Sequence, residues 1–147
     1  MNKKVDLDKV REDAIYIFHN GYACSESVIY AIQQNVDPTI TQEEIAMSSG
    51  FPWGLNAGSL CGALAGGTMS LGHVFGRKEL GADNELILDT TKELHDHFLA
   101  TNGETHCGKL IEGMDPDSAE RKEFCTKMVA DAAVKVATLI IENRQEK

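Results

Sequence analysis

The chain of 147 residues is long enough for one domain with an apolar core that needs neither disulfides nor a metal to fold. Its 23 acidic and 14 basic residues give a net charge of −9, which repels phosphate backbones and anionic lipids and argues against nucleic-acid and membrane partners. Long stretches of helical periodicity and only 3 prolines predict an all-α fold. We expect one domain over residues 1–147, a bundle of about five to six helices with a glycine-rich central helix.

The first two helices are predicted from the residues that end them. A periodic apolar stretch stops at Asn20-Gly21, residue types that accept the left-handed backbone found after many helices. The second helix begins near Cys24 and ends at Asp37-Pro38, because proline cannot continue a helix and restricts the residue before it.

A capping box predicts a third, short helix. Thr41 and Glu44 are spaced so that each side chain can bind the backbone N–H of the other. This helix is expected to run through about Met47, after which residues 50–54 break the chain. The glycine-rich helix is predicted over about residues 58–75.

The glycine-rich segment has an unusual composition. Residues 51–75 carry no charge, yet their glycines, serines and threonine leave too few large apolar side chains for a membrane span, so we predict a buried core helix. Gly58, Gly62 and Gly66 fall four apart, and each costs a helix about 0.5 to 1 kcal/mol relative to alanine. Close packing of another helix, of a cofactor or of a second copy in a homodimer would offset that cost.

Two longer helices complete the predicted bundle. One covers about residues 83–101 and stops at Asn102-Gly103, and the last begins near Ser118. No segment has the alternating pattern of a strand.

The four cysteines are the strongest candidates for a functional site. Cys24, Cys61 and Cys107 are expected near helix N-termini, with Cys61 in the first turn of the glycine-rich helix. The helix dipole there favours a thiolate and lowers the thiol pKa. Cys125 lies on the apolar face of the last helix. The absence of a C-x-x-C pair means that any shared site is assembled by the fold, and four inert buried thiols remain an alternative.

The histidines give only weak evidence for a functional site, and known catalytic motifs give none. His95 and His97 point to different faces of one predicted helix, so they are poor joint ligands. His106, beside Cys107, is a candidate spare ligand or a group that tunes the thiolate. The sequence contains no Walker loop, dinucleotide fingerprint or nucleophile elbow, and no catalytic residue is assigned.

The order of the cysteines resembles a known family. Residues 61–66 read C-G-A-x-x-G, with Cys24 before them and Cys107 and Cys125 after them, a pattern similar to the C-GCAxxG-C-C family of redox-active proteins over nearly the whole chain. The resemblance implies a redox role with a bound group such as an iron–sulfur cluster, in proteins often encoded near oxidoreductases or transporters. The residues it assigns to that group are Cys24, Cys61, Gly62, Gly66, Cys107 and Cys125.

Several functions therefore stay open. The first is electron transfer through an iron–sulfur cluster held by all four cysteines, with an unidentified redox partner protein. The second is a metal-free thiol–disulfide oxidoreductase or redox sensor, in which Cys61 attacks and another cysteine resolves. The third is a structural zinc module with four cysteine ligands. The charged N-terminal stretch has no apolar leader, so we expect a cytoplasmic protein.

Overall fold

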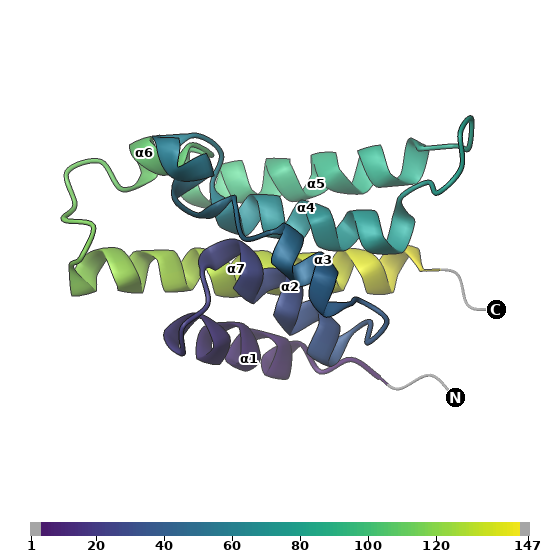
Figure 1. The fold of residues 1–147 in the computed structure, drawn as a ribbon, viewed down its shortest axis with the longest axis horizontal. Helices are drawn as coiled ribbons and strands as arrows, with labels where there is room; N and C mark the ends of the chain where they lie inside the picture. Colours follow the sequence, from purple (N-terminus) through teal and green to yellow (C-terminus); the bar gives the residue numbers. More distant parts are fainter. Residues whose placement is uncertain (1–3, 145–147) are drawn as a thin grey trace.

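Helices make up the regular structure of residues 4–144, the part of the chain that this computed structural model describes (Figure 1). In chain order they are α1 Leu7–His19, α2 Cys24–Asn35, α3 Gln42–Met47, the π-helical turn η1 Gly54–Gly58, α4 Gly62–Phe75, α5 Glu85–Asn102, α6 Cys107–Leu110 and α7 Ala119–Asn143. Five of these helices have more than ten residues. Between residues 4 and 144 the β-type pairing is limited to one bridge, which joins Leu60 and His106. The predicted all-α class is confirmed.

The longest helix, α7, is the element around which the bundle is organised. Ser118 caps its start by accepting a hydrogen bond from the Arg121 N–H at 3.1 Å. In Figure 1, α7 crosses most of the view, with α1 along one side and α4 and α5 along the other. The helix contacts α1, α2, α4 and α5. Its inward face is fully buried from Val129 to Ile140 and forms one wall of the apolar core.

Helices α2 and α4 approach each other closely because two glycines lie between them. A Cβ atom on Gly66 would stand 2.3 Å from the backbone oxygen of Ser25, and one on Gly62 would stand 2.3 Å from the Cys24 sulfur. Neither distance leaves room for a side chain unless the neighbouring group moves. The closely packed neighbour expected beside these glycines is therefore the start of α2.

The start of the glycine-rich helix differs from the prediction. Helix α4 begins at Gly62, which leaves Gly58 outside the helix with a φ of +75° and Cys61 at the N-cap position. The predicted three-glycine stripe thus has two helical members. The reason is a left-handed turn over residues 53–56, which a pattern of apolar spacing cannot signal.

The other helix ends agree with the sequence. Gly21 has a φ of +107° just after α1, and Gly103 closes α5 with a φ of +78°. The expected capping box of α3 forms, with the Glu44 N–H donating to Thr41 Oγ1 at 3.1 Å. Of the eight residues that follow Cys61, six are buried and two, Thr68 and Met69, are half-buried, as predicted for a core helix. Across residues 4–144, no helix combines the length and apolar character needed to cross a bilayer.

Candidate functional site

All four cysteines line a single cavity at one end of the bundle. They come from four different segments: Cys24 is the first residue of α2, Cys61 caps α4, Cys107 begins α6 and Cys125 lies about two turns into α7. The cavity has a volume of about 160 Å³. A cavity of this size can hold a small bound group, since one of about 150 Å³ accepts a benzene molecule.

A short backbone bridge places Cys61 beside Cys107. The Cys61 N–H donates to the Thr105 carbonyl at 2.8 Å, and the Cys107 N–H donates to the Ser59 carbonyl at 2.7 Å. Two glycines allow this approach, because a Cβ on Gly108 would meet the Gly58 oxygen at 3.2 Å. The bridge joins two segments that lie over 40 positions apart in the sequence, and no local pattern indicated it.

Cys24 is positioned by the packing of α2 on α4. Its sulfur lies against the Cα of Gly62, the residue directly after Cys61, so the two cysteines face the cavity from adjacent walls. Gly62 lines the cavity, whereas Gly66 lies one turn further along α4 against the Ser25 backbone. Of the two glycines predicted to contact a bound group, only Gly62 is placed to do so.

A left-handed turn forms another part of the cavity wall. Trp53, Leu55 and Asn56 have φ values of 59°, 61° and 53°, with Gly54 between them at 60°. For residues with a Cβ this backbone costs about 1 to 2 kcal/mol each. Such strain is retained where a particular geometry is needed, and here it turns the chain from α3 towards Cys61 while placing Trp53 at the cavity.

The thiols are harder to ionise than expected from their helix N-termini. Burial, followed by the nearby Cys24, raises the pKa of Cys61 to about 12, and burial raises the pKa of Cys24 to about 11. The N–H groups of Ala63 and Leu64 act to lower the Cys61 pKa, as a helix start should, but burial outweighs them. The predicted lowering of the thiol pKa is therefore wrong for Cys61 and Cys24. The Cys107 pKa is also raised, by burial and then by Cys125.

Two positively charged side chains line the same cavity as the thiols. Arg121 and Lys122, in the first turn of α7, both line the cavity, and no aspartate or glutamate between residues 4 and 144 does. The Arg121 guanidinium lies 4.6 Å from the centre of the Trp53 ring, and the Lys122 ammonium donates to the Phe18 carbonyl at 3.2 Å. Nothing in the local sequence marks either residue as functional, since a basic pair on a helix is most often solvated.

The histidines lie away from the cavity. His106 is half-exposed, and its Nδ1 atom lies 2.9 Å from Glu104 Oε1, so its side chain is turned towards that carboxylate rather than towards the thiols. His95 and His97 have different partners, Asp96 and Asp131, as expected for residues on different faces.

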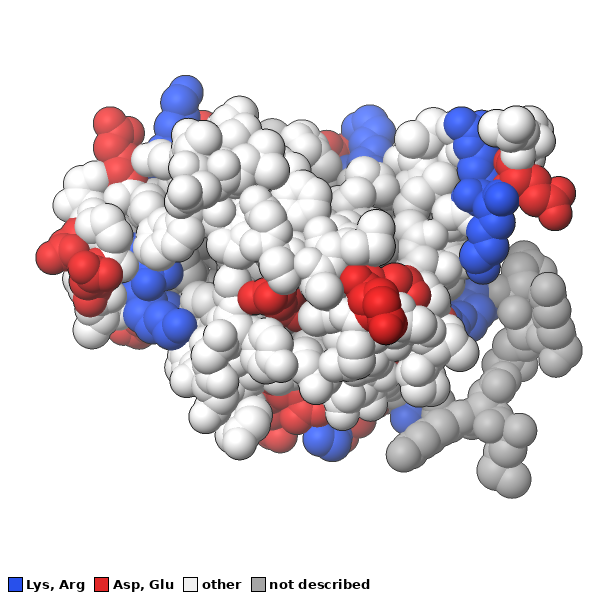
Figure 2. All heavy atoms as spheres, viewed as in Figure 1, with Lys and Arg blue, Asp and Glu red and all other residues white. Residues whose placement is uncertain are grey.

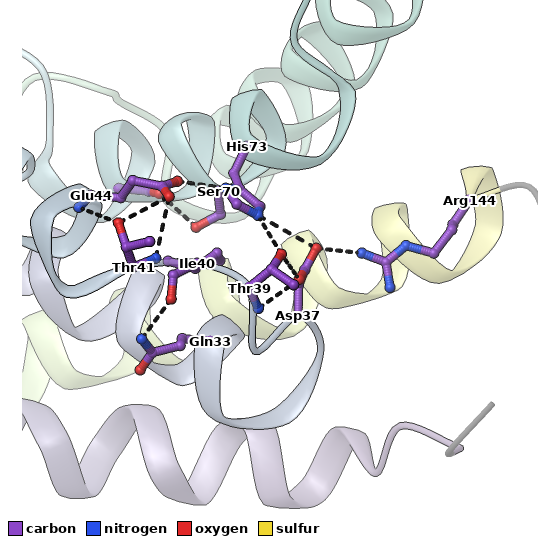
Figure 3. Close-up of polar contacts among 10 residues, drawn as sticks. Gln33, Asp37, Thr39, Ile40, Thr41, Glu44, Ser70, His73 and Arg144 are labelled. Atoms are coloured by element: carbon purple, nitrogen blue, oxygen red, sulfur yellow. Dashed lines mark hydrogen bonds and ion pairs between the residues drawn. The ribbon is translucent and has the colours of Figure 1, made fainter. Parts of the chain in front are cut away.

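His73 is part of a polar network on another side of the bundle (Figure 3). Its Nδ1 atom lies 2.5 Å from Glu44 Oε2, and its Nε2 atom lies 2.9 Å from Thr39 Oγ1. Asp37 joins the network through Thr39 and accepts a hydrogen bond from Arg144 at 2.8 Å. The network ties the loop before α3 to α4 and to the end of α7.

The metal-binding capacity of the cysteines depends on their spacing. In the described part of the chain, no three histidine, cysteine or acidic side chains are placed to hold one metal ion, and the four cysteines are free thiols. The thiols share a cavity without converging on one point. This spacing does not match a preformed zinc site, whose four sulfurs all lie about 2.3 Å from one ion.

The fold and the cavity define a class of small helical proteins in which four cysteines from separate segments line one cavity. The chain belongs to the family described as "Putative redox-active protein (C_GCAxxG_C_C)", which it matches over residues 22–139. It is also similar to an "Uncharacterized protein" of Archaeoglobus fulgidus, with 21% identity over 137 residues that cover 86% of this chain and 90% of the relative. No solved structure gives a significant match.

Proposed function

We propose that the protein carries electrons through an iron–sulfur cluster bound by Cys24, Cys61, Cys107 and Cys125. The observation that supports this most directly is that the four cysteines, from four separate segments, line one cavity of about 160 Å³. Four thiols around a small space form the donor set that two-iron and four-iron clusters use. Membership of a redox-active family agrees with this chemistry.

The donor set and its surroundings suit a cluster. All four thiols line the same cavity, and cysteine thiolates are the ligands that two-iron and four-iron clusters use. The positive side chains of Arg121 and Lys122 suit the negative charge that four thiolates bring.

When bound, the cluster would supply reversible one-electron chemistry. The chain would provide the four sulfur ligands, and apolar side chains such as Leu110, Met128 and Val129 would limit the access of water. One electron would enter from a reduced partner protein and one would leave to an oxidised partner, with no bond to the chain made or broken. We place this activity in the cytoplasm, where thiols stay reduced. The partner is a redox protein or a second copy of the chain.

The metal-free thiol–disulfide mechanism has less support. It needs a thiolate at neutral pH, whereas burial raises the pKa of Cys61 to about 12 and that of Cys24 to about 11. Burial of Cys61, the predicted attacking thiol, also restricts access for a disulfide substrate. A metal or cluster would remove this obstacle, because coordination itself deprotonates the thiol.

The test is anaerobic reconstitution with iron and sulfide, followed by metal and sulfide analysis and a visible absorption spectrum. The parent chain should take up both and absorb visible light, and each single Cys→Ser variant should lose most of that absorption. His106→Gln is the matched control, because His106 adjoins Cys107 in sequence but lies outside the cavity wall. A parent chain that binds no iron, or serine variants that load like the parent, would rule the proposal out.

A further inference from the structure

The cavity wall carries positive charge in a strongly acidic protein. Acidic residues outnumber basic ones by 23 to 14, and Figure 2 shows acidic and basic side chains distributed around the visible face. In the described part of the chain, the residues that line the cavity include Arg121 and Lys122 but no carboxylate. A local excess of cations against the charge of the whole chain indicates that this wall faces an anion.

Both cations are held in place by neutral groups. Arg121 donates from Nε to the Pro116 carbonyl at 2.9 Å and stacks on Trp53, whose left-handed backbone presents the ring. Lys122 lies 3.7 Å from the centre of the Phe18 ring and donates to the Phe18 carbonyl. Among residues 4–144, neither cation forms an ion pair with a carboxylate. These contacts fix the position of each charge without neutralising it.

The position of the two cations in α7 is unfavourable for the helix itself. They occupy its third and fourth positions, where the positive end of the helix dipole favours acidic side chains. Burial also lowers the Lys122 pKa, which means that its surroundings disfavour the charged form. A nearby negative charge would stabilise a half-buried cation in these conditions.

The sulfur atoms of the cavity can provide that charge. All four cysteines and both cations line the same cavity, so ionised sulfurs there would face positive charge. Lys122 is held against Phe18 of α1, and Arg121 is held against Trp53, which directly precedes η1.

We propose that Arg121 and Lys122 are the counter-charges of the cysteine site, where they stabilise the sulfur anions and raise the reduction potential of the bound cluster. The effect on the reduction potential rests on the proposed function, because it requires a bound cluster. Reduction adds a negative charge to a group that is already anionic, so a cation nearby favours the reduced form. The two residues are positioning residues that act through charge and do not serve as ligands.

The first experiment measures the midpoint potential of reconstituted protein in an anaerobic redox titration, together with its iron and sulfide content. Lys122→Gln should shift the potential to a more negative value, and Arg121→Gln should do the same. Lys122→Arg keeps the charge and should restore the parent potential, which a purely structural role would not require. Lys127→Gln is the matched control, because Lys127 is an exposed lysine of α7 that does not line the cavity. Equal potentials in Lys122→Gln, Arg121→Gln and the parent would overturn the inference.

A second experiment needs no cluster. In the metal-free protein, the rate of thiol alkylation as a function of pH reports how readily the cysteines ionise. Lys122→Gln should move the alkylation profile to higher pH and slow the reaction several-fold near neutral pH, while Lys127→Gln should match the parent. If the parent binds no iron but this shift appears, the cluster proposal fails and the counter-charge role stands. If the parent binds iron and sulfide but the substitutions change neither the alkylation profile nor the midpoint potential, the counter-charge role is ruled out and the cluster proposal stands.

Discussion

Gly62 lies so close to Cys24 that a methyl group on its Cα would stand 2.3 Å from the Cys24 sulfur. The glycine after Cys61 therefore makes room for a second cysteine of the same site. Because the contact is with the end of a side chain, a substitution can be accommodated by turning the Cys24 sulfur away from the cavity.

Gly62→Ala should accordingly damage the site more than the fold. We expect the variant to remain helical but to lose most of its iron and sulfide uptake in anaerobic reconstitution, because one ligand is displaced. Circular dichroism and metal analysis on the same sample separate the two effects. Full loading of Gly62→Ala would show that the Cys24 sulfur is not needed in its present position.

Gly66→Ala should affect stability directly. Its new methyl group would meet the Ser25 backbone oxygen at 2.3 Å, and the backbone cannot turn away as a thiol can. We expect a loss of about 1 to 3 kcal/mol in the free energy of unfolding, typical of an overpacked core. Urea denaturation of Gly66→Ala and of the parent measures this difference in the free energy of unfolding.

Gly72→Ala provides the control on the same helix. A Cβ at Gly72 meets nothing within 4 Å, so the change should stabilise α4 by about 0.5 to 1 kcal/mol through helix propensity. A similar loss of stability in both alanine variants would mean that the close approach of α2 and α4 is not what requires Gly66.

The raised thiol pKa values predict that the metal-free protein loses stability in alkaline solution. Burial raises the pKa of Cys24 to about 11 and that of Cys61 to about 12, so the unfolded chain releases these protons first, near its ordinary value of about 8.5. The stabilising effect is present below that pH and is lost as the pH rises towards the folded values. Each thiol should contribute a slope of about 1.4 kcal/mol per pH unit in that window.

Urea unfolding of the metal-free protein at several pH values from 8 to 11 checks this. Cys61→Ser should show a shallower decline than the parent, because one of the two thiols no longer titrates. An identical slope in both proteins would show that Cys61 is ionised as easily in the folded chain as in the unfolded one.

The network around His73 predicts a loss of stability in acid. Burial acts to raise the pKa of Asp37, but hydrogen bonds from Thr39 and the charges of Arg144 and His73 outweigh it, so the net shift is downward. The pKa of Glu44 is lowered in the same way by Thr41 and His73. Carboxyl groups with lowered pKa values stabilise the fold above their unfolded values near 4, and this stability is lost as the pH falls through the folded values.

Glu44→Gln should lower the free energy of unfolding by about 1 kcal/mol at pH 7, a modest effect because the side chain is partly exposed. The difference from the parent should shrink as the pH is lowered to 3. Glu43→Gln is the matched control, since Glu43 lies in the same first turn of α3 with its side chain exposed. A pH-independent difference would show that Glu44 contributes through packing rather than charge.

Local residue chemistry was sufficient to predict most of the fold. The stop at Asn20-Gly21 and the Thr41 to Glu44 capping box depend on neighbours within four positions, and both appear where expected. The start of α4 was missed because Trp53 and Leu55 adopt a left-handed backbone that their residue types do not indicate.

The site was harder to predict because its geometry depends on distant contacts. The order of the cysteines suggested that they belong together, but the backbone bridge between Ser59 and Cys107 joins segments far apart in the sequence. The predicted lowering of the Cys61 pKa was wrong because burial raises this pKa by more than the helix start lowers it. Burial depends on the whole fold and cannot be read from neighbouring residues. The position of Arg121 and Lys122 beside the cysteines likewise depends on the folded structure, which brings them to the wall of the same cavity.

The backbone bridge from residues 59–61 to residues 105–107 has a consequence for biosynthesis. Because Cys24 and Cys125 complete the same cavity, a ribosome must release most of the chain before the four thiols can meet. A prosthetic group held by all four cysteines could therefore be fully bound only after residue 125 has left the ribosome.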